Sequence, residues 1–203
     1  MLNTQLKMTG SNEVGFSLLE LVIAMTITLA VMVAASSLLA SSLRTRTREN
    51  LRSEALAAAQ RALNIMSREV SNSGYGLTDN GIVAVDSNAS SIRVRANLDN
   101  NTDLNGIDED VRFILQPASS NYQIVRYDNS NAGNPPPILA ANISTLTIKY
   151  LDVAGTDVNP ANAERVSIEV KVNLPAGPEQ PAGVVNLVSQ VALRNAPGTL
   201  QQF

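Results

Sequence analysis

The chain has 203 residues, of which 44% are hydrophobic, 16% charged and 3% aromatic, and its 15 basic side chains oppose 18 acidic ones. It contains no His and no Cys, which excludes Ser-His-Asp and Cys-His catalysis, zinc sites built from these residues, haem ligation and disulfides. A net charge of −3 offers no basic surface for nucleic acid. We therefore expect neither an enzyme nor a nucleic-acid-binding protein.

A short hydrophilic segment, residues 1–15, precedes a long apolar stretch. Residues 16–43 contain no Pro or Gly and carry one charge, that of Glu20. As a helix this stretch would be about 42 Å long, enough to cross a hydrocarbon core of about 30 Å. A cleavable secretory signal has a shorter apolar run of about 7–15 residues. The stretch therefore predicts a membrane-inserted helix.

Glu20 lies near the start of this apolar stretch, and its charge has two interpretations. A carboxylate in hydrocarbon costs a few kcal/mol unless it is paired. It could lie in the interfacial layer, where the positive end of the helix dipole favours an anion. It could instead be a functional carboxylate that pairs with a cation inside an apolar assembly. Physical chemistry alone leaves both open.

The helix changes character beyond Leu43 without a stop signal. Four arginines follow, and apolar residues then recur at spacings of three and four between Leu51 and Val70. This pattern predicts an amphipathic second half over residues 44–73, with one apolar stripe to bury. Helix is expected to end at Ser71, and Gly74 is a candidate left-handed cap. The arginines are Arg44, Arg46, Arg48 and Arg52.

Residues 74–203 alternate apolar and polar side chains with a period of two, which indicates an antiparallel sheet with one wet face. The amphipathic stripe of the helix is the natural cover for the other face, so the expected fold class is α+β. Residues 74–203 would form the head. We predict seven strands, at Ile82–Val85, Ile92–Ala96, Val111–Leu115, Tyr122–Tyr127, Thr145–Tyr150, Glu164–Leu174 and Val184–Arg194.

A loop rich in Asp and Asn is expected between the strands at Ile92–Ala96 and Val111–Leu115. Asp99, Asn101, Asp103 and Asn105 alternate before Gly106, a spacing that could bring side-chain oxygens to one calcium ion. An EF-hand counted from Asn101 would need a bidentate Glu at position 112, where the sequence has Arg112, and no helices flank the loop. The loop is therefore either a solvated acidic hairpin or a structural calcium site. No other cofactor is indicated.

The residues at the leader junction resemble the processing site of type IV prepilins and pseudopilins. In that family a short hydrophilic leader ends in Gly, a prepilin peptidase cuts after it, and the new N-terminal Phe is methylated. Gly15, Phe16 and Glu20 match this motif position by position, and a long apolar helix follows as in the family. The resemblance implies a pilin-like fold, in which a long N-terminal helix packs on an antiparallel sheet.

The resemblance also implies a role for Glu20. Cleavage creates an α-amine at Phe16, and a carboxylate four residues later, in the same or a neighbouring subunit, can neutralise it. Either charge would be costly in an apolar setting without the other. The implied partners are the prepilin peptidase, other pilin or pseudopilin subunits, the inner-membrane assembly platform and inner-membrane lipid.

Two departures from the family pattern stand out. No Pro interrupts the apolar helix, so we expect no kink there. The four arginines beyond the span would, by the positive-inside rule alone, lie in the cytoplasm, opposite to pilin topology.

The helix end, Met66–Gly76, and the segments Leu146–Asp152 and Val191–Asn195 are similar to PilW-type minor pilins.

These features predict a minor pilin-like structural subunit that is incorporated into, or primes, a type IV pilus used in functions such as adhesion. Its expected location is the bacterial inner membrane, as a single-pass protein with its head in the periplasm, and then the cell surface. A type II secretion pseudopilin is the first alternative, since it is built from the same parts. The second is an uncleaved membrane-anchored periplasmic binding or enzymatic domain.

Overall fold

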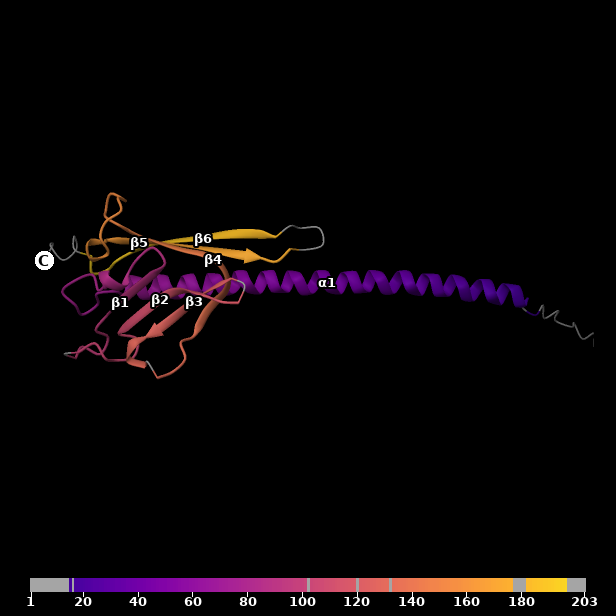
Figure 1. Ribbon diagram of the computed structural model, residues 1–203, viewed down its shortest axis with the longest axis horizontal. Helices are drawn as coiled ribbons and strands as arrows, with labels where there is room; N and C mark the ends of the chain where they lie inside the picture. Colours follow the sequence, from indigo (N-terminus) through magenta and orange to yellow (C-terminus); the bar gives the residue numbers. More distant parts are fainter. Residues whose placement is uncertain are drawn as a thin grey trace, which may run out of the picture. The chain divides into compact units, whose positions relative to one another are not determined.

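The computed structural model describes residues 15, 17–101, 103–119, 121–131, 133–176 and 182–196. Its contacts divide the chain into two units, residues 1–46 and residues 47–203. Helix α1, Leu18–Ser71, belongs to the first unit at its start and to the second at its end, and the second unit also holds all six described strands (Figure 1). The long helix and the antiparallel sheet form the expected α+β fold, with a layout like that of a type IV pilin.

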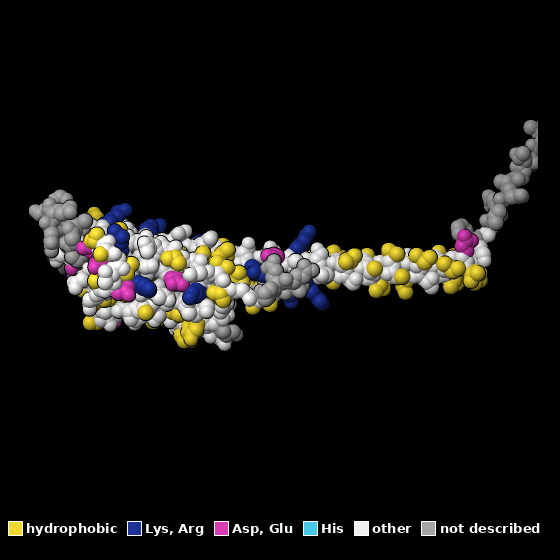
Figure 2. All heavy atoms as spheres, turned by 90° about the horizontal axis from the view of Figure 1, so that it is seen from above, with side chains coloured by type: hydrophobic (Ala, Val, Ile, Leu, Met, Phe, Trp, Pro, Cys, Tyr) yellow, Lys and Arg dark blue, Asp and Glu magenta, His cyan; other side chains and the backbone are white. Residues whose placement is uncertain are grey.

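The first part of α1 is apolar and exposed throughout. Its large hydrophobic side chains, from Leu18 to Leu43, are each at least 47% exposed, and Figure 2 shows them gathered along the helix surface. By length and composition this helix could cross a membrane. The absence of Pro and Gly explains why it is continuous, and its end at Ser71 confirms the prediction.

Six strands form one antiparallel sheet in the order in which they occur in the sequence, so each strand pairs with the next. Such a meander needs no crossover, because antiparallel neighbours can be joined directly at one end of the sheet. The strands are β1 Ser91–Arg95, β2 Asp110–Pro117, β3 Tyr122–Asp128, β4 Ile138–Leu151, β5 Arg165–Leu174 and β6 Gly183–Ala192.

The sheet bends at β4, its longest strand. The β3–β4 register shifts twice, and the β4–β5 register shifts between Ile143 and Thr145, next to Asn142 with a φ of 58°. Such irregularities increase the local twist and bend the strand. As a result, β1–β3 and β4–β6 lie on two sides of the last part of α1 (Figure 1). Glu69 of the helix contacts Arg126 of β3, and Ser67 contacts Ser189 of β6.

The core lies between the last part of α1 and the inner face of the sheet. The helix stripe contributes Ala55, Ala59, Ala62, Leu63, Met66 and Val70, all buried. Its three alanines let the helix approach the sheet closely, and alternate residues of β5, from Val166 to Leu174, face it. This packing confirms the period-two pattern of the head and the predicted stripe from Ala55 to Val70, whereas Leu51, the expected start of the stripe, is 51% exposed.

The predicted strand at Ile82–Val85 is wrong. Only Ile82 makes a bridge, to Val94, and the chain then turns into a short 3-10 helix, Ala84–Asp86. Ile82 is buried in the core, but Val85 is 92% exposed, so the apolar run does not continue along the sheet as a strand. The other six predicted strands are present, with β4 beginning seven residues earlier and β6 ending two residues earlier than expected.

The turn after α1 uses the predicted left-handed glycine. Gly74 has a φ of 80°, and its N–H donates to the Arg95 carbonyl at 2.8 Å, which attaches the helix end to β1. A side chain at Gly74 would collide with backbone atoms of Asp79 and Asn80. The glycine is therefore required both by backbone conformation and by close packing.

Candidate functional site

The start of α1 carries the predicted processing and assembly residues. Gly15 is exposed and precedes the helix, whose first backbone bond runs from the Leu21 N–H to the Ser17 carbonyl at 3.1 Å. Phe16 lies outside the described residues. Glu20 is exposed in the first turn, where the helix dipole favours an anion. Gly15 and Glu20 therefore lie within a short distance of each other along the chain, at an accessible helix terminus.

Hydroxyl groups in the apolar part of α1 are satisfied by the helix itself. Thr26 and Thr28 donate to the carbonyls of Ile23 and Ala24, and Ser36 and Ser37 donate to those of Met32 and Ala34, all at 2.7–2.8 Å. These bonds leave the hydroxyl protons with partners when water is absent. The segment is thus compatible with lipid or with the apolar surfaces of neighbouring helices.

The four candidate calcium residues lie in the β1–β2 loop as predicted, in consecutive turns closed by their own side chains. Asp99 accepts from the Asn101 N–H at 3.2 Å, Asn101 from the Asp103 N–H at 2.9 Å, and Asp103 from the Asn105 N–H at 3.3 Å. Each oxygen is thereby used by the backbone two residues later. Among the described residues, no group of three or more acidic side chains lies close enough together to hold a metal ion.

Glu109 organises this loop, a role that the sequence did not indicate. Its side chain is 1% exposed and accepts backbone N–H bonds from Leu98 at 2.7 Å, Asp99 at 3.1 Å and Gly106 at 2.8 Å. The Asp99 N–H above all, with those of Gly106 and Leu98, holds the pKa of the Glu109 carboxyl below its usual value. In the sequence Glu109 stands between Asp108 and Asp110, so it looked like one member of a solvated acidic run.

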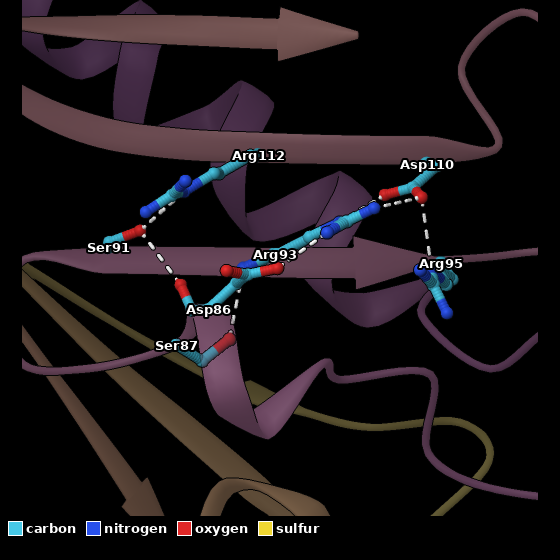
Figure 3. Close-up of polar contacts among 7 residues, drawn as sticks. All are labelled: Asp86, Ser87, Ser91, Arg93, Arg95, Asp110 and Arg112. Atoms are coloured by element: carbon cyan, nitrogen blue, oxygen red, sulfur yellow. Dashed lines mark hydrogen bonds and ion pairs between the residues drawn. The ribbon is translucent and has the colours of Figure 1, made fainter. Parts of the chain in front are cut away.

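A charged network covers the outer face of β1 and β2 (Figure 3). Arg93 donates two bonds of 2.7 Å to the carboxylate of Asp110 and a third to Asp86. The hydrogen bond with Asp110 is the main reason that the pKa of Arg93 is raised. Burial opposes ionisation of Asp110, but Arg93 holds its pKa below the usual value. The network pins the 3-10 helix of residues 84–86 over the sheet, a structural role.

A second ion cluster joins three elements. Arg126 of β3 contacts Glu69 of α1 and Asp108 of the β1–β2 loop. Burial is the main cause that raises the pKa of Glu69 above its usual value, despite its partner Arg126. The side chains of Arg126 and Glu69 are 14% and 22% exposed, so this pair is shielded from solvent far more than a surface ion pair.

A cavity of about 530 Å³ lies in the head beside the helix. Leu51, Ala55 and Ala58 line one side, and Leu174 and Pro175 at the end of β5 line another. Three asparagines complete it, and Asn173 donates to Asn121 at 2.8 Å. None of the predicted site residues lies in it.

Comparison with known proteins gives no match to any family model, curated protein or solved structure.

Proposed function

We propose that this chain is a minor pilin-like subunit, cleaved between Gly15 and Phe16 by a prepilin peptidase and methylated at Phe16. The observation that carries this proposal is the position of an exposed Gly and an exposed first-turn Glu at the start of one long apolar helix, whose other end packs into a β-sheet head. In this account the chain is anchored once in the bacterial inner membrane with its head in the periplasm. It then enters, or primes, a type IV pilus.

Glu20 guides assembly by charge neutralisation. Removal of residues 1–15 leaves a cationic amine on Phe16, and incorporation among apolar helices transfers it away from water. A single charge at the centre of a membrane helix costs about 3 kcal/mol on insertion scales. Pairing the Phe16 amine of one subunit with the Glu20 carboxylate of another lowers that cost. Subunit addition is therefore favoured at a position where the two charges meet.

Exposed apolar side chains support the same proposal. A soluble protein rarely exposes a contiguous apolar surface as long as the first part of α1. Such a helix needs lipid before assembly and other apolar helices afterwards. The four arginines beyond the span oppose the required orientation under the positive-inside rule, so orientation would have to be set by the leader and the secretion machinery.

The test replaces Glu20 with Gln and measures the chain in membranes and in filaments sheared from cells. We expect E20Q to insert and to be cleaved normally but to be depleted from the sheared filaments. Glu49→Gln is the matched control, since Glu49 is also exposed on α1 but lies outside the apolar part. Equal incorporation of E20Q and E49Q would contradict the role of Glu20. Absence of the wild-type chain from pili, together with a secretion defect on its deletion, would indicate a pseudopilin.

A further inference from the structure

The sequence contains two Asn–Gly pairs, Asn80–Gly81 and Asn105–Gly106. In such a pair the glycine nitrogen can attack the side-chain carbonyl carbon of the preceding asparagine, because glycine has no side chain to block the approach. Both glycine nitrogens are held in the same way. Gly81 donates its N–H to Asp79 and Gly106 donates to Glu109, each at 2.8 Å. The clearest difference between the two pairs lies in the asparagine side chain.

The side chain of Asn80 is fixed and shielded from water. It is 1% exposed, its amide donates to the carbonyls of Pro160 and Ala163 at 2.9 and 3.1 Å, and its oxygen accepts from the Ile82 N–H at 3.1 Å. Gly81 is buried as well. The Asn80 amide can turn toward the Gly81 nitrogen only by breaking these buried bonds, which makes attack costly.

The side chain of Asn105 is exposed in the β1–β2 loop. In the described part of the chain its amide makes no hydrogen bond, although its backbone N–H donates to Asp103 at 3.3 Å. Exposed side chains change rotamer in picoseconds to nanoseconds. Rotation about the Cα–Cβ bond of Asn105 therefore moves the side-chain carbonyl carbon toward the Gly106 nitrogen without unfolding the head, and proximity of this kind favours reaction.

We propose that Asn105–Gly106 is a site of spontaneous covalent modification in the folded chain, at which asparagine is converted into aspartate or isoaspartate. Hydroxide removes the proton of the Gly106 nitrogen, and this nitrogen forms a bond to the side-chain carbonyl carbon of Asn105. The bond from that carbon to the amide nitrogen breaks, and ammonia leaves with a proton from water, which regenerates hydroxide. Water then opens the cyclic imide at either carbonyl. One ammonia is lost for each water consumed, with no change of oxidation state.

The conversion changes the loop in two ways. Each product adds a carboxylate to a loop that already carries Asp99, Asp103 and Asp108. Isoaspartate also routes the main chain through the former side chain and lengthens it by one carbon atom. The Gly106 N–H then cannot keep its bond to Glu109 unless the loop shifts. Modification therefore weakens the contact through which Glu109 holds the loop.

Glu109 slows this reaction by holding the attacking nitrogen. A carboxylate is too weak a base to remove an amide proton, and its negative charge favours the protonated nitrogen. The bond from the Gly106 N–H to Oε2 of Glu109 must therefore break before hydroxide can act. The same opening exposes this N–H to hydrogen exchange, which hydroxide also catalyses. Glu109 accordingly restrains the modification without preventing it.

Peptide mass spectrometry of the full chain, purified in detergent, tests this proposal. The chain is incubated at mildly alkaline pH, both folded and in denaturant, in water enriched in a heavy oxygen isotope, which marks only the acid formed during incubation. For each Asn–Gly pair, the rate in the folded chain is divided by the rate in denaturant. We expect this ratio to be about tenfold higher, or more, at Asn105 than at Asn80, because only the exposed amide reaches its attacking nitrogen. Equal ratios, or a higher ratio at Asn80, would overturn the proposal.

Glu109→Gln tests the restraint separately. It removes the charge that holds the Gly106 N–H and should speed conversion at Asn105 by about threefold or more. The rate at Asn80, which reports on the integrity of the head, should stay the same. Glu54→Gln is the matched control, because Glu54 is exposed on α1 outside the loop, and it should change neither rate.

Faster conversion at both pairs in E109Q, or conversion at Asn105 no faster than in E54Q, would overturn the role of Glu109. Neither measurement depends on filament assembly, so this proposal can fail or succeed independently of the proposed function.

Discussion

Arg126 of β3 donates its Nε–H to both carboxylate oxygens of Glu69 on α1, at 3.0 and 3.2 Å. The same guanidinium reaches Asp108 in the β1–β2 loop. One side chain thus connects the helix, the sheet and the loop that precedes β2. The planar fork of Arg suits this role, since it can hold two carboxylates in fixed directions at once.

Replacing Arg126 should destabilise the head. In Arg126→Met the largely buried Glu69 carboxyl loses its ion-pair partner, and we expect a loss of about 1–3 kcal/mol. Arg126→Lys, which keeps the charge but not the fork, should lose less. Thermal unfolding in detergent, followed by circular dichroism, measures the effect. Arg165→Met serves as control because Arg165 is exposed on β5. Equal midpoints for R126M and R165M would contradict the role of this cluster.

Asn80 holds the turn after α1 against the β4–β5 connection. Its side chain is 1% exposed, donates to the carbonyls of Pro160 and Ala163, and accepts from the Ile82 N–H. Asn80→Ala leaves the Ala163 carbonyl and the Ile82 N–H without these partners, while the Pro160 carbonyl keeps its bond from the Ala163 N–H. The change should cost about 2 kcal/mol and lower the midpoint by about 4–8 °C.

The exposed Asn50 on α1 supplies the control for this prediction, as Asn50→Ala. A midpoint for N80A within error of that of N50A would show that the turn tolerates the loss of these bonds.

Glu109 should give the β1–β2 loop an acid-sensitive stability. The pKa of its carboxyl in the folded state lies below the ordinary value of 4.5, chiefly because the Asp99 N–H stabilises the anion. The carboxylate therefore stabilises the fold above pH 4.5, and this contribution is lost as the pH falls through the lowered pKa. Glu109→Gln should speed amide exchange at Leu98 and Gly106 at neutral pH and should reduce the loss of stability on acidification.

The exposed Glu54 provides the comparison, since Glu54→Gln removes a carboxylate without touching the loop. An acid dependence that is the same in wild type, E109Q and E54Q would rule out Glu109 as its source.

Calcium is not expected to be required for this loop. One side-chain oxygen of each of Asp99, Asn101 and Asp103 already accepts a backbone N–H bond, and Glu109 closes the loop from inside. We predict that amide exchange of residues 97–110 is the same in excess calcium and in excess chelator. Slower exchange in calcium alone, abolished by Asp99→Asn together with Asp103→Asn, would establish the alternative predicted from the sequence.

Much of the fold follows from periodicity. The apolar stripe from Ala55 to Val70 and the alternation from Val166 to Leu174 each have one buried face, and burial is what such patterns encode. The prediction at Ile82–Val85 is wrong because a run of four apolar residues does not distinguish a strand from a turn: Ile82 enters the core, but the chain then forms the 3-10 helix Ala84–Asp86. The bend at Asn142 depends on the packing of the sheet around the helix, which no local pattern contains.

The candidate site divides in the same way. Gly15 and Glu20 could be found from the sequence because their motif is local and their chemistry depends on spacing along one helix. Glu109 could not, since its importance comes from backbone N–H groups that the fold of the loop directs at it. The position of β6 at the edge of the sheet could be seen only from the strand order, because an uncharged alternating strand could equally well be a central one.

Intact mass and N-terminal sequence of the membrane-extracted chain, from cells with and without their prepilin peptidase, test the central claim most directly. The account predicts loss of residues 1–15 and one added methyl group on Phe16 when the peptidase is active, and a full-length chain when it is absent. A chain that keeps Met1 in cells with active peptidase would contradict it. The protein would then be an uncleaved anchored domain.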